Sequence, residues 1–168
     1  LGFRHIGPQQ REVPSAVFFD LATWHMIHWR YVPRALREAQ ALRDNYSDLG
    51  LHQRLMTVLN ERLGHHLAND VEQAKIATSH TGDTAELNLD YVEAGLSTTL
   101  SATSLTQHLN AHLTRVVQCA QDCVRDAGLT SGALDAIYLT GGSSALTPFQ
   151  RALQAAFVGT PLVEGDLF

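Results

Sequence analysis

The chain has few cysteines, no excess of positive charge and no long apolar run, and each of these deficits excludes a class of protein. Two cysteines in 168 residues cannot form the disulfide framework of a small secreted domain. Lys and Arg total 12 against 17 Asp and Glu, so the formal net charge is -5 and the cationic surface that nucleic acids or anionic membranes attract is missing. No apolar run approaches the roughly 18 residues that cross a bilayer, and the start, LGFRHIGPQQRE, lacks the zones of a secretory signal. We therefore expect a cytoplasmic protein that binds neither nucleic acid nor membrane.

The length and composition are those of a single domain or of two small subdomains. A chain of 168 residues, of which 45% are apolar, can bury a core of its own. The sequence opens on Leu1 without an initiator Met and stops at Phe168, soon after a glycine. We therefore expect a piece of a longer polypeptide.

The first half of the sequence predicts helices. Residues 1–14 hold two Gly and two Pro and are expected to form a loop. The spacing of apolar residues predicts a helix over residues 15–29, and Pro33 begins a second helix that reaches about residue 46. The longest periodic stretch, residues 49–79, predicts a long helix with a bend near Gly64. The residues expected on one side of the first helix are Val17, Leu21, Trp24 and His28.

The second half alternates between strands and helices. Apolar residues alternate over residues 84–89 and again over 96–101, which predicts a β-hairpin. A helix follows from Ser104 or Thr106 to about Ala127, where Gly128 provides a C-terminal stop. The last part predicts a strand over 134–140, a glycine turn, a helix that Thr147 caps and Pro148 begins, and a final strand over 161–163.

These elements indicate an α+β fold with two parts. We expect a mostly helical subdomain with the long helix and the β-hairpin over residues 1–103. Residues 104–168 are expected to form a partial α/β subdomain, whose remaining strands the sequence does not contain. A strand left without partners predicts that the isolated fragment self-associates.

Two pairs of potential metal ligands lie on the predicted helix after the hairpin. His108 and His112 are four residues apart, as are Cys119 and Cys123, and all four lie on one stripe. The pairs are separated by seven residues, about 10 Å of helix, and so cannot close on one tetrahedral ion. We interpret the four as packing residues and expect neither a metal site nor a catalytic nucleophile. The apolar face that they border consists of Leu105, Leu109, Leu113, Val116, Ala120 and Val124.

A candidate anion site lies in the segment DAIYLTGGSSALTPFQRALQAAF, residues 135–157. A buried strand that runs into paired glycines and then into a capped helix brings backbone N–H groups and the positive end of a helix close to an anion. The pattern is neither of the two common glycine-rich phosphate motifs, nor the nucleophile turn of hydrolases. It suits a phosphate or a ribose, and it also occurs in ordinary strand-to-helix connections.

Two motifs in the same chain resemble the actin-like ATPases. The run IYLTGGSSALTPFQRAL is similar to their adenosine motif, and is closest to that of the seventy-kilodalton heat-shock chaperones. The run NDVEQAKIATS, residues 69–79, is similar to the helix of that family that carries a Glu-x-x-Lys…Ser set before a hairpin such as TAELNL. The resemblance covers roughly residues 48–166. It identifies the chain as a fragment of the second half of the nucleotide-binding domain, most similar to the divergent, YegD-type branch.

The second motif places three polar side chains on one stripe of a helix. Glu72, Lys75 and Ser79 would offer a carboxylate, an ammonium and a hydroxyl to ribose hydroxyls and an adenine edge. An exposed Glu–Lys helix pair is the alternative interpretation. The resemblance implies that Glu72 and Lys75 meet the ribose and that Ser79 meets the adenine. It implies a role at the ribose and inner phosphates for Gly141, Gly142 and Ser143.

The chain also departs from the family pattern. In the family two arginines stack on the faces of adenine, and this sequence has Ile76 and Ala145 at these places, with one extra residue before Pro148. The glycine-rich hairpins and the lysine that hold the outer phosphates and the metal in the family are absent from the sequence, so we expect no ATP hydrolysis by this fragment alone.

The resemblance implies the adenosine-side lobe of an ATP-dependent chaperone of the stress response. The complete parent would bind ATP or ADP with magnesium. The partners implied are the remaining lobe of the same ATPase domain, client peptides and co-chaperones. The alternative is a non-catalytic interaction lobe that kept the fold but lost nucleotide binding. A sugar or acetate kinase lobe is a third hypothesis, which would require a different helical insert.

Overall fold

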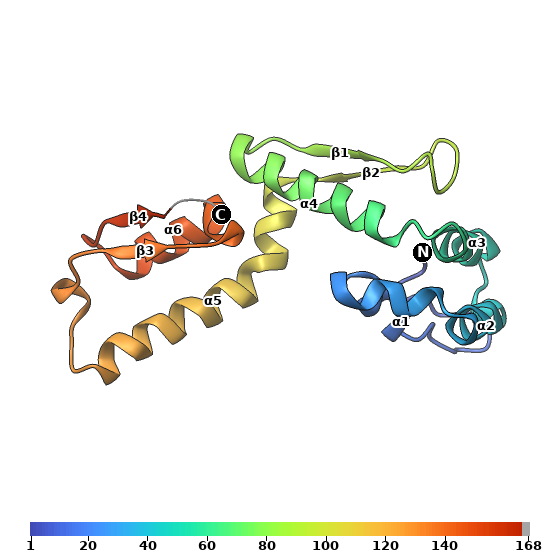
Figure 1. The fold of residues 1–168 in the computed structure, drawn as a ribbon, viewed down its shortest axis with the longest axis horizontal. Helices are drawn as coiled ribbons and strands as arrows, with labels where there is room; N and C mark the ends of the chain where they lie inside the picture. Colours follow the sequence, from blue (N-terminus) through green and yellow to red (C-terminus); the bar gives the residue numbers. More distant parts are fainter. Residues whose placement is uncertain (166–168) are drawn as a thin grey trace. The chain divides into compact units, whose positions relative to one another are not determined.

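The computed structural model describes residues 1–165, without the side chains of Ser131 and Ser143. Two compact units divide the chain, the first made of residues 1–73 and 86–98, the second of residues 74–85 and those from 99 onward. Helices and two small sheets of two strands each build them, which confirms the predicted α+β class (Figure 1).

The start of the first unit is a sequence of short helices. The α-helices α1 (Ala16–Leu21) and α2 (Pro33–Ala41) alternate with the 3-10 helices η1 (Trp24–Tyr31) and η2 (Leu42–Asn45). The single helix predicted over residues 15–29 is therefore wrong, because Thr23 takes an extended conformation and the chain continues as a tighter 3-10 helix. The tighter winding rotates the later side chains, so Trp24 is 60% exposed although Val17 and Leu21 are buried as expected.

The long helix predicted over residues 49–79 is two helices, α3 (Leu49–Asn60) and α4 (Gly64–Thr81). The interruption lies close to the predicted bend. Arg62 adopts φ 56, which no α-helix accommodates. Gly64 packs so closely that a Cβ there would lie 2.6 Å from side-chain atoms of Ile27 and Tyr31. The break is therefore set by packing against η1.

The core of the first unit lies between α3 and the helices before it. Leu55 and Val58 are fully buried, and Leu59 is 1% exposed. Val58 and Leu59 follow Leu55 by three and four residues, so the three side chains form the inner face of α3. Ile27 of η1 is also fully buried and belongs to the same cluster.

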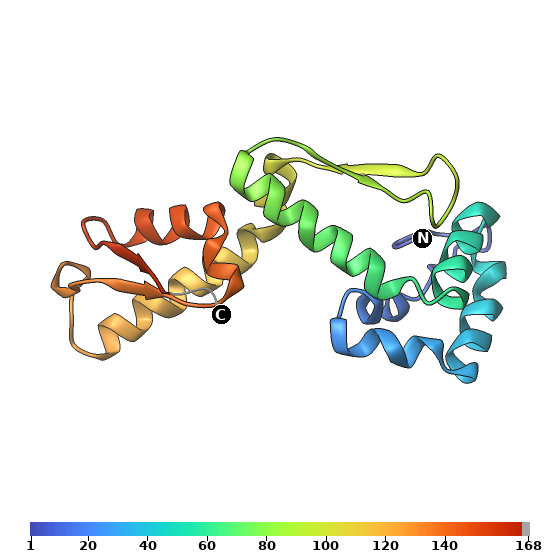
Figure 2. The ribbon, with the colours of Figure 1, turned by 45° about the horizontal axis from the view of Figure 1, so that its top comes forward.

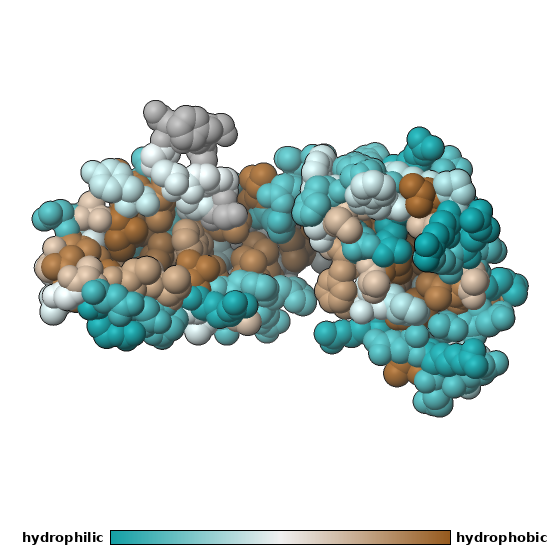
Figure 3. Space-filling view, turned by 60° about the horizontal axis from the view of Figure 1, so that its bottom comes forward, coloured by the Kyte–Doolittle hydropathy of each residue, from teal (hydrophilic) through white to brown (hydrophobic). Residues whose placement is uncertain are grey.

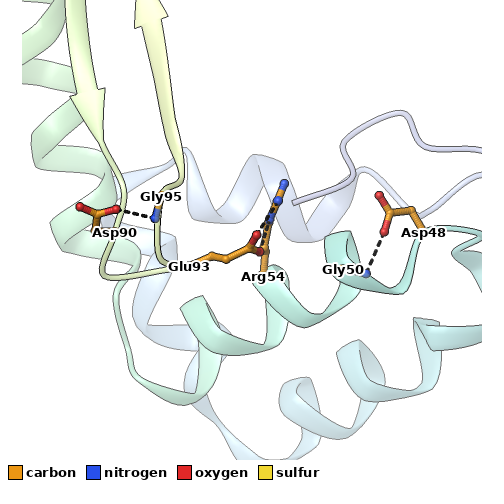
Figure 4. Close-up of polar contacts among 6 residues, drawn as sticks. All are labelled: Asp48, Gly50, Arg54, Asp90, Glu93 and Gly95. Atoms are coloured by element: carbon orange, nitrogen blue, oxygen red, sulfur yellow. Dashed lines mark hydrogen bonds and ion pairs between the residues drawn. The ribbon is translucent and has the colours of Figure 1, made fainter.

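The predicted hairpin is confirmed as β1 (Ala85–Asn88) and β2 (Ser97–Leu100). The close-up in Figure 4 shows its connecting loop, where Gly95 donates a 2.7 Å hydrogen bond to Asp90 and Glu93 points toward Arg54 of α3. Arg54 makes two charged hydrogen bonds to Glu93, of 2.6 and 2.9 Å. These hydrogen bonds, and then the positive charge of Arg54, hold the pKa of Glu93 below its usual range. The loop is thus tied to α3 by a two-bond ion pair.

The second unit packs two helices on one face of a small parallel sheet (Figure 2). Strand β3 (Ile137–Leu139) pairs with β4 (Leu162–Glu164), so both predicted strands are present. The remaining elements are α5 (Ala102–Asp126), η3 (Ser131–Ala133), η4 (Gly142–Ala145) and α6 (Thr147–Ala156). The helix predicted after the hairpin is confirmed, and Gly128, at φ 72, follows its end as expected. Among the described residues, no helix has both the length and the apolar character that crossing a membrane requires.

The histidine and cysteine pairs of α5 do not pack. The prediction that they would is wrong, because all four side chains are exposed: His108, His112, Cys119 and Cys123. The covered face of α5 contacts the buried Leu139, Leu153 and Phe157 through Val117, Ala120 and Val124. Val116, predicted on that face, is 46% exposed.

The described residues leave the other face of the sheet in the second unit uncovered. Tyr138 and Val163 stand opposite each other in the strand register and are 74% and 36% exposed. Their strand neighbours Ile137 and Leu162 turn to the covered side and join its apolar cluster. Figure 3 shows hydrophobic side chains gathered on the face of this unit that the view presents. Parallel sheets are normally covered on both faces, whereas the part of the chain that the structure describes covers one face of this sheet.

Candidate functional site

The glycine turn begins directly after β3. Gly141 has φ +85, a conformation that side chains rarely adopt, so this position requires glycine. The backbone N–H and the hydroxyl of Ser144 both donate to the Gly141 carbonyl, at 3.0 and 2.5 Å, and close the turn into η4. A Cβ built on Gly141 or Gly142 would meet no atom within 4 Å. The space over the turn is therefore open to a ligand.

Two hydrogen bonds join the end of α4 to the start of α6. The Thr147 N–H donates to Ser79 Oγ at 2.9 Å, and the Thr147 hydroxyl donates to the Ser79 carbonyl at 2.7 Å. Ser79 is 7% exposed. Its carbonyl is in the last turn of α4 and the Thr147 N–H is in the first turn of α6, so neither has a partner within its own helix. The two residues cap each other's helix, and we call this pair the Ser79–Thr147 clamp.

The clamp fixes the segment that follows the glycine turn. Thr147 comes two residues after the end of η4, and the N-cap residue of α6, Leu146, makes no side-chain capping bond. Next to Ser79, the hydroxyl of Thr78 donates to the Leu100 carbonyl at 3.0 Å and is 1% exposed. The end of α4 is thereby bonded both to α6 and to the end of β2.

A small hollow lies beside the clamp. Its volume is about 150 Å³, and Ser79, Thr106, Thr147 and Arg151 are among the residues that line it. An engineered cavity of about this size in another protein holds benzene. The hollow therefore has room for a ring-sized group and not for a complete nucleoside, which would extend into the open space outside.

The structure brings together only part of the predicted site. Ser79 is linked through Thr147 to the segment that carries Gly141 and Gly142. Glu72 is exposed on the part of α4 that belongs to the first unit, and Lys75 is half-buried on the part that belongs to the second. The backbone of Ser143 lies in η4, and its side chain lies outside the described residues.

Sequence reasoning missed the role of Thr147. The sequence assigns Thr147 only to the cap of its own helix, whereas the structure shows its hydroxyl on the carbonyl of Ser79, 68 residues earlier. The one available signal is the extra residue before Pro148. Ile76 and Ala145 stand at the two positions where the family that the sequence resembles has arginines. Ile76 is 40% exposed and Ala145 is half-buried.

The side chains that could bind a metal ion are scattered over the described part of the chain. Within residues 1–165 no three or more His, Cys, Asp or Glu side chains are grouped so that they could hold a metal ion. A magnesium ion prefers an octahedral set of oxygen ligands. The carboxylates described here do not provide such a set.

A comparison with models of protein families matches residues 47–164 to the Hsp70 protein family. The matched range begins just before α3 and ends at β4. It therefore contains both candidate motifs, the end of α4 and the glycine turn. The helices η1 and α2 lie outside it.

Proposed function

The chain belongs to the Hsp70 family, and from this premise we propose that it forms the adenosine side of the nucleotide-binding domain of a molecular chaperone. The observation that carries the proposal is the Ser79–Thr147 clamp, because it joins the two motifs on which the proposed site depends. The ligand is ATP or ADP, with the base toward the end of α4 and the ribose and inner phosphates over Gly141, Gly142 and Ser143.

The proposed contacts agree with the hydrogen-bonding capacity of the residues. Ser79 Oγ accepts from the Thr147 N–H and keeps its own proton, so it can still donate one hydrogen bond to a ring nitrogen. The open space over Gly142 lets a sugar or a phosphate approach the backbone closely. The first turn of α6 adds partial positive charge near an anion. Glu72 and Lys75 are proposed to meet the ribose hydroxyls.

Magnesium and the outer phosphates belong to the other lobe of the parent protein in this proposal. The residues described here offer no carboxylate cluster for the metal. The uncovered sheet face around Tyr138 and Val163 suits the remaining strands and helices of the same ATPase domain. Client peptides and co-chaperones would be bound through the parent.

We expect weak binding by this chain alone. Ile76 and Ala145 provide no guanidinium to the adenine, so cation–π attraction of about 0.5–2 kcal/mol per contact is missing. A dissociation constant on the order of a millimolar, about 4 kcal/mol, follows for a ligand held by a few hydrogen bonds. Adenosine should bind nearly as well as ATP, because this chain contributes little to the outer phosphates.

NMR titration of ¹⁵N-labelled protein with adenosine, ADP and ATP tests the proposal. The amides near Ser79 and Gly142 should shift together along one binding curve. Gly142→Val should abolish these shifts, because the new side chain enters the open space over the turn. Gly132→Val is the matched control, since a Cβ at Gly132 also meets no atom within 4 Å and lies in η3, away from the site. Equal shifts in both variants would refute the site.

The second candidate function is a protein-interaction lobe without nucleotide. The specific observation in its favour is Ile76, an apolar side chain that is 40% exposed where the family carries a stacking arginine. If no nucleotide shifts either segment, in this chain or in the complete parent, the interaction lobe becomes the better account.

A further inference from the structure

Two thiols lie side by side on the surface of α5, and the proposed nucleotide site does not use them. Cys119 and Cys123 are both free and both exposed. They are four residues apart in a continuous helix of 25 residues, so their side chains project from the same face in successive turns.

The spacing of the two residues distinguishes metal binding from a disulfide. Residues at positions i and i+4 of a helix have Cβ atoms about 5–6 Å apart. A disulfide needs about 3.5–4.5 Å between Cβ atoms, so oxidation would have to distort the helix. Two metal–sulfur bonds of about 2.3 Å in a linear arrangement need sulfur atoms roughly 4.6 Å apart, which the intact helix can supply.

We propose that Cys119 and Cys123 form a two-coordinate site for a soft monovalent cation, with Cu(I) as the representative ion. Thiolates are the ligands that select Cu(I) among the common protein side chains. Binding replaces the protons of the two thiols by one Cu⁺, so that two Cu–S bonds form, two protons are released and no electron is transferred.

The surroundings fit two ligands and not four. The Oδ1 atom of Asp122 accepts from Gln118 at 2.8 Å and pairs with Arg125 at 2.7 Å, so it already has two partners. His112 is seven residues before Cys119, about 10 Å along the helix. Within the described chain no group of three or more ligand side chains occurs. A tetrahedral ion such as Zn²⁺ would therefore lack protein ligands.

Competition with the chelator bathocuproine disulfonate under nitrogen tests the proposal. Reduced, metal-free protein is titrated against the coloured Cu(I)–chelator complex, and the loss of its absorbance gives the copper bound per chain. We expect one equivalent. Cys119→Ser and Cys123→Ser should each weaken binding at least tenfold, whereas His108→Asn should leave it unchanged.

A relocated thiol provides the matched control for geometry. The double variant Cys119→Ser with Gln118→Cys keeps two thiols, but five residues apart and about 140° around the helix axis. It should bind no better than the single-cysteine variants, with an unchanged far-ultraviolet circular dichroism spectrum that confirms the helix. Equal binding by the relocated variant would overturn the proposal, and so would half an equivalent of copper with dimers in size-exclusion chromatography.

Discussion

The Ser79–Thr147 clamp can be broken without changing the shape of either residue greatly. Thr147→Val keeps a branched side chain but removes the hydroxyl that donates to the Ser79 carbonyl at 2.7 Å. Ser79→Ala removes the oxygen that accepts from the Thr147 N–H at 2.9 Å. Each variant leaves one polar group at a helix end without its partner, in a place where Ser79 is only 7% exposed.

The expected cost follows from the capping role of each bond. Loss of an N-cap oxygen destabilises a protein by about 0.5–2 kcal/mol, and a typical internal hydrogen bond contributes about 0.5–1.5 kcal/mol. We therefore expect about 1 kcal/mol for each single variant. In a chain of this size this corresponds to a fall in Tm of about 2–4 °C. The double variant should cost no more than the sum, because both bonds depend on the same close approach of α4 and α6.

Urea unfolding of the three variants, followed by circular dichroism, measures these costs. Thr114→Val is the control, because Thr114 is exposed and its hydroxyl donates to the Asn110 carbonyl of its own helix, at 2.9 Å. We expect the control to change stability by less than about 0.5 kcal/mol. If Thr147→Val were no more destabilising than Thr114→Val, the two helix ends would not be joined as described.

Three further predictions concern the hairpin and the sheet. Arg54 holds the pKa of Glu93 below its usual range, so the stability that this ion pair contributes is complete above the ordinary Glu pKa and is lost as pH falls. Between pH 7 and pH 3, the Tm should therefore fall less steeply in Glu93→Gln than in the unchanged protein. Leu87 is 8% exposed, so Leu87→Asp should lower the Tm clearly, whereas Thr98→Asp, on an exposed position of β2, should not; equal effects would show that the strand register is wrong. The uncovered sheet face should make the chain self-associate and bind a hydrophobic dye. Tyr138→Lys should reduce self-association, measured by light scattering, and dye binding, measured by fluorescence. If neither changes, the apolar surface responsible lies elsewhere.

Elements with a local pattern could be predicted from the sequence. The hairpin follows from alternation of apolar residues, and the strand, glycine turn and helix after residue 134 follow from an apolar run, paired glycines and Pro148. Each of these signals lies within a few residues of the element that it specifies. The glycine turn is the clearest case, since the positive φ of Gly141 is a property of that residue alone.

Features that depend on distant residues could not be predicted in this way. The break between α3 and α4 follows from the packing of Gly64 against Ile27, which is 37 positions earlier in the chain. The exposure of Cys119 and Cys123 follows from which side of α5 meets the sheet, and periodicity gives the width of an apolar stripe more reliably than its centre.

The candidate site shows the same division. The residue types at Glu72, Lys75, Ser79 and the glycine pair are readable as two separate motifs. Their connection through Thr147 is not, because it joins side chains 68 residues apart and requires the fold to be known. Ser79 is also buried, which a helical stripe drawn on an isolated helix does not reveal.

Isotope-filtered nuclear Overhauser measurements on adenosine bound to labelled protein test the proposed function most directly. Ligand protons report which protein protons lie within a few ångströms, whereas shift changes also respond to indirect effects. We expect the adenine protons to contact the end of α4 near Ser79, and the ribose protons to contact Gly142, in one and the same complex. Contacts to only one of the two segments, or to neither, would contradict an adenosine site between them.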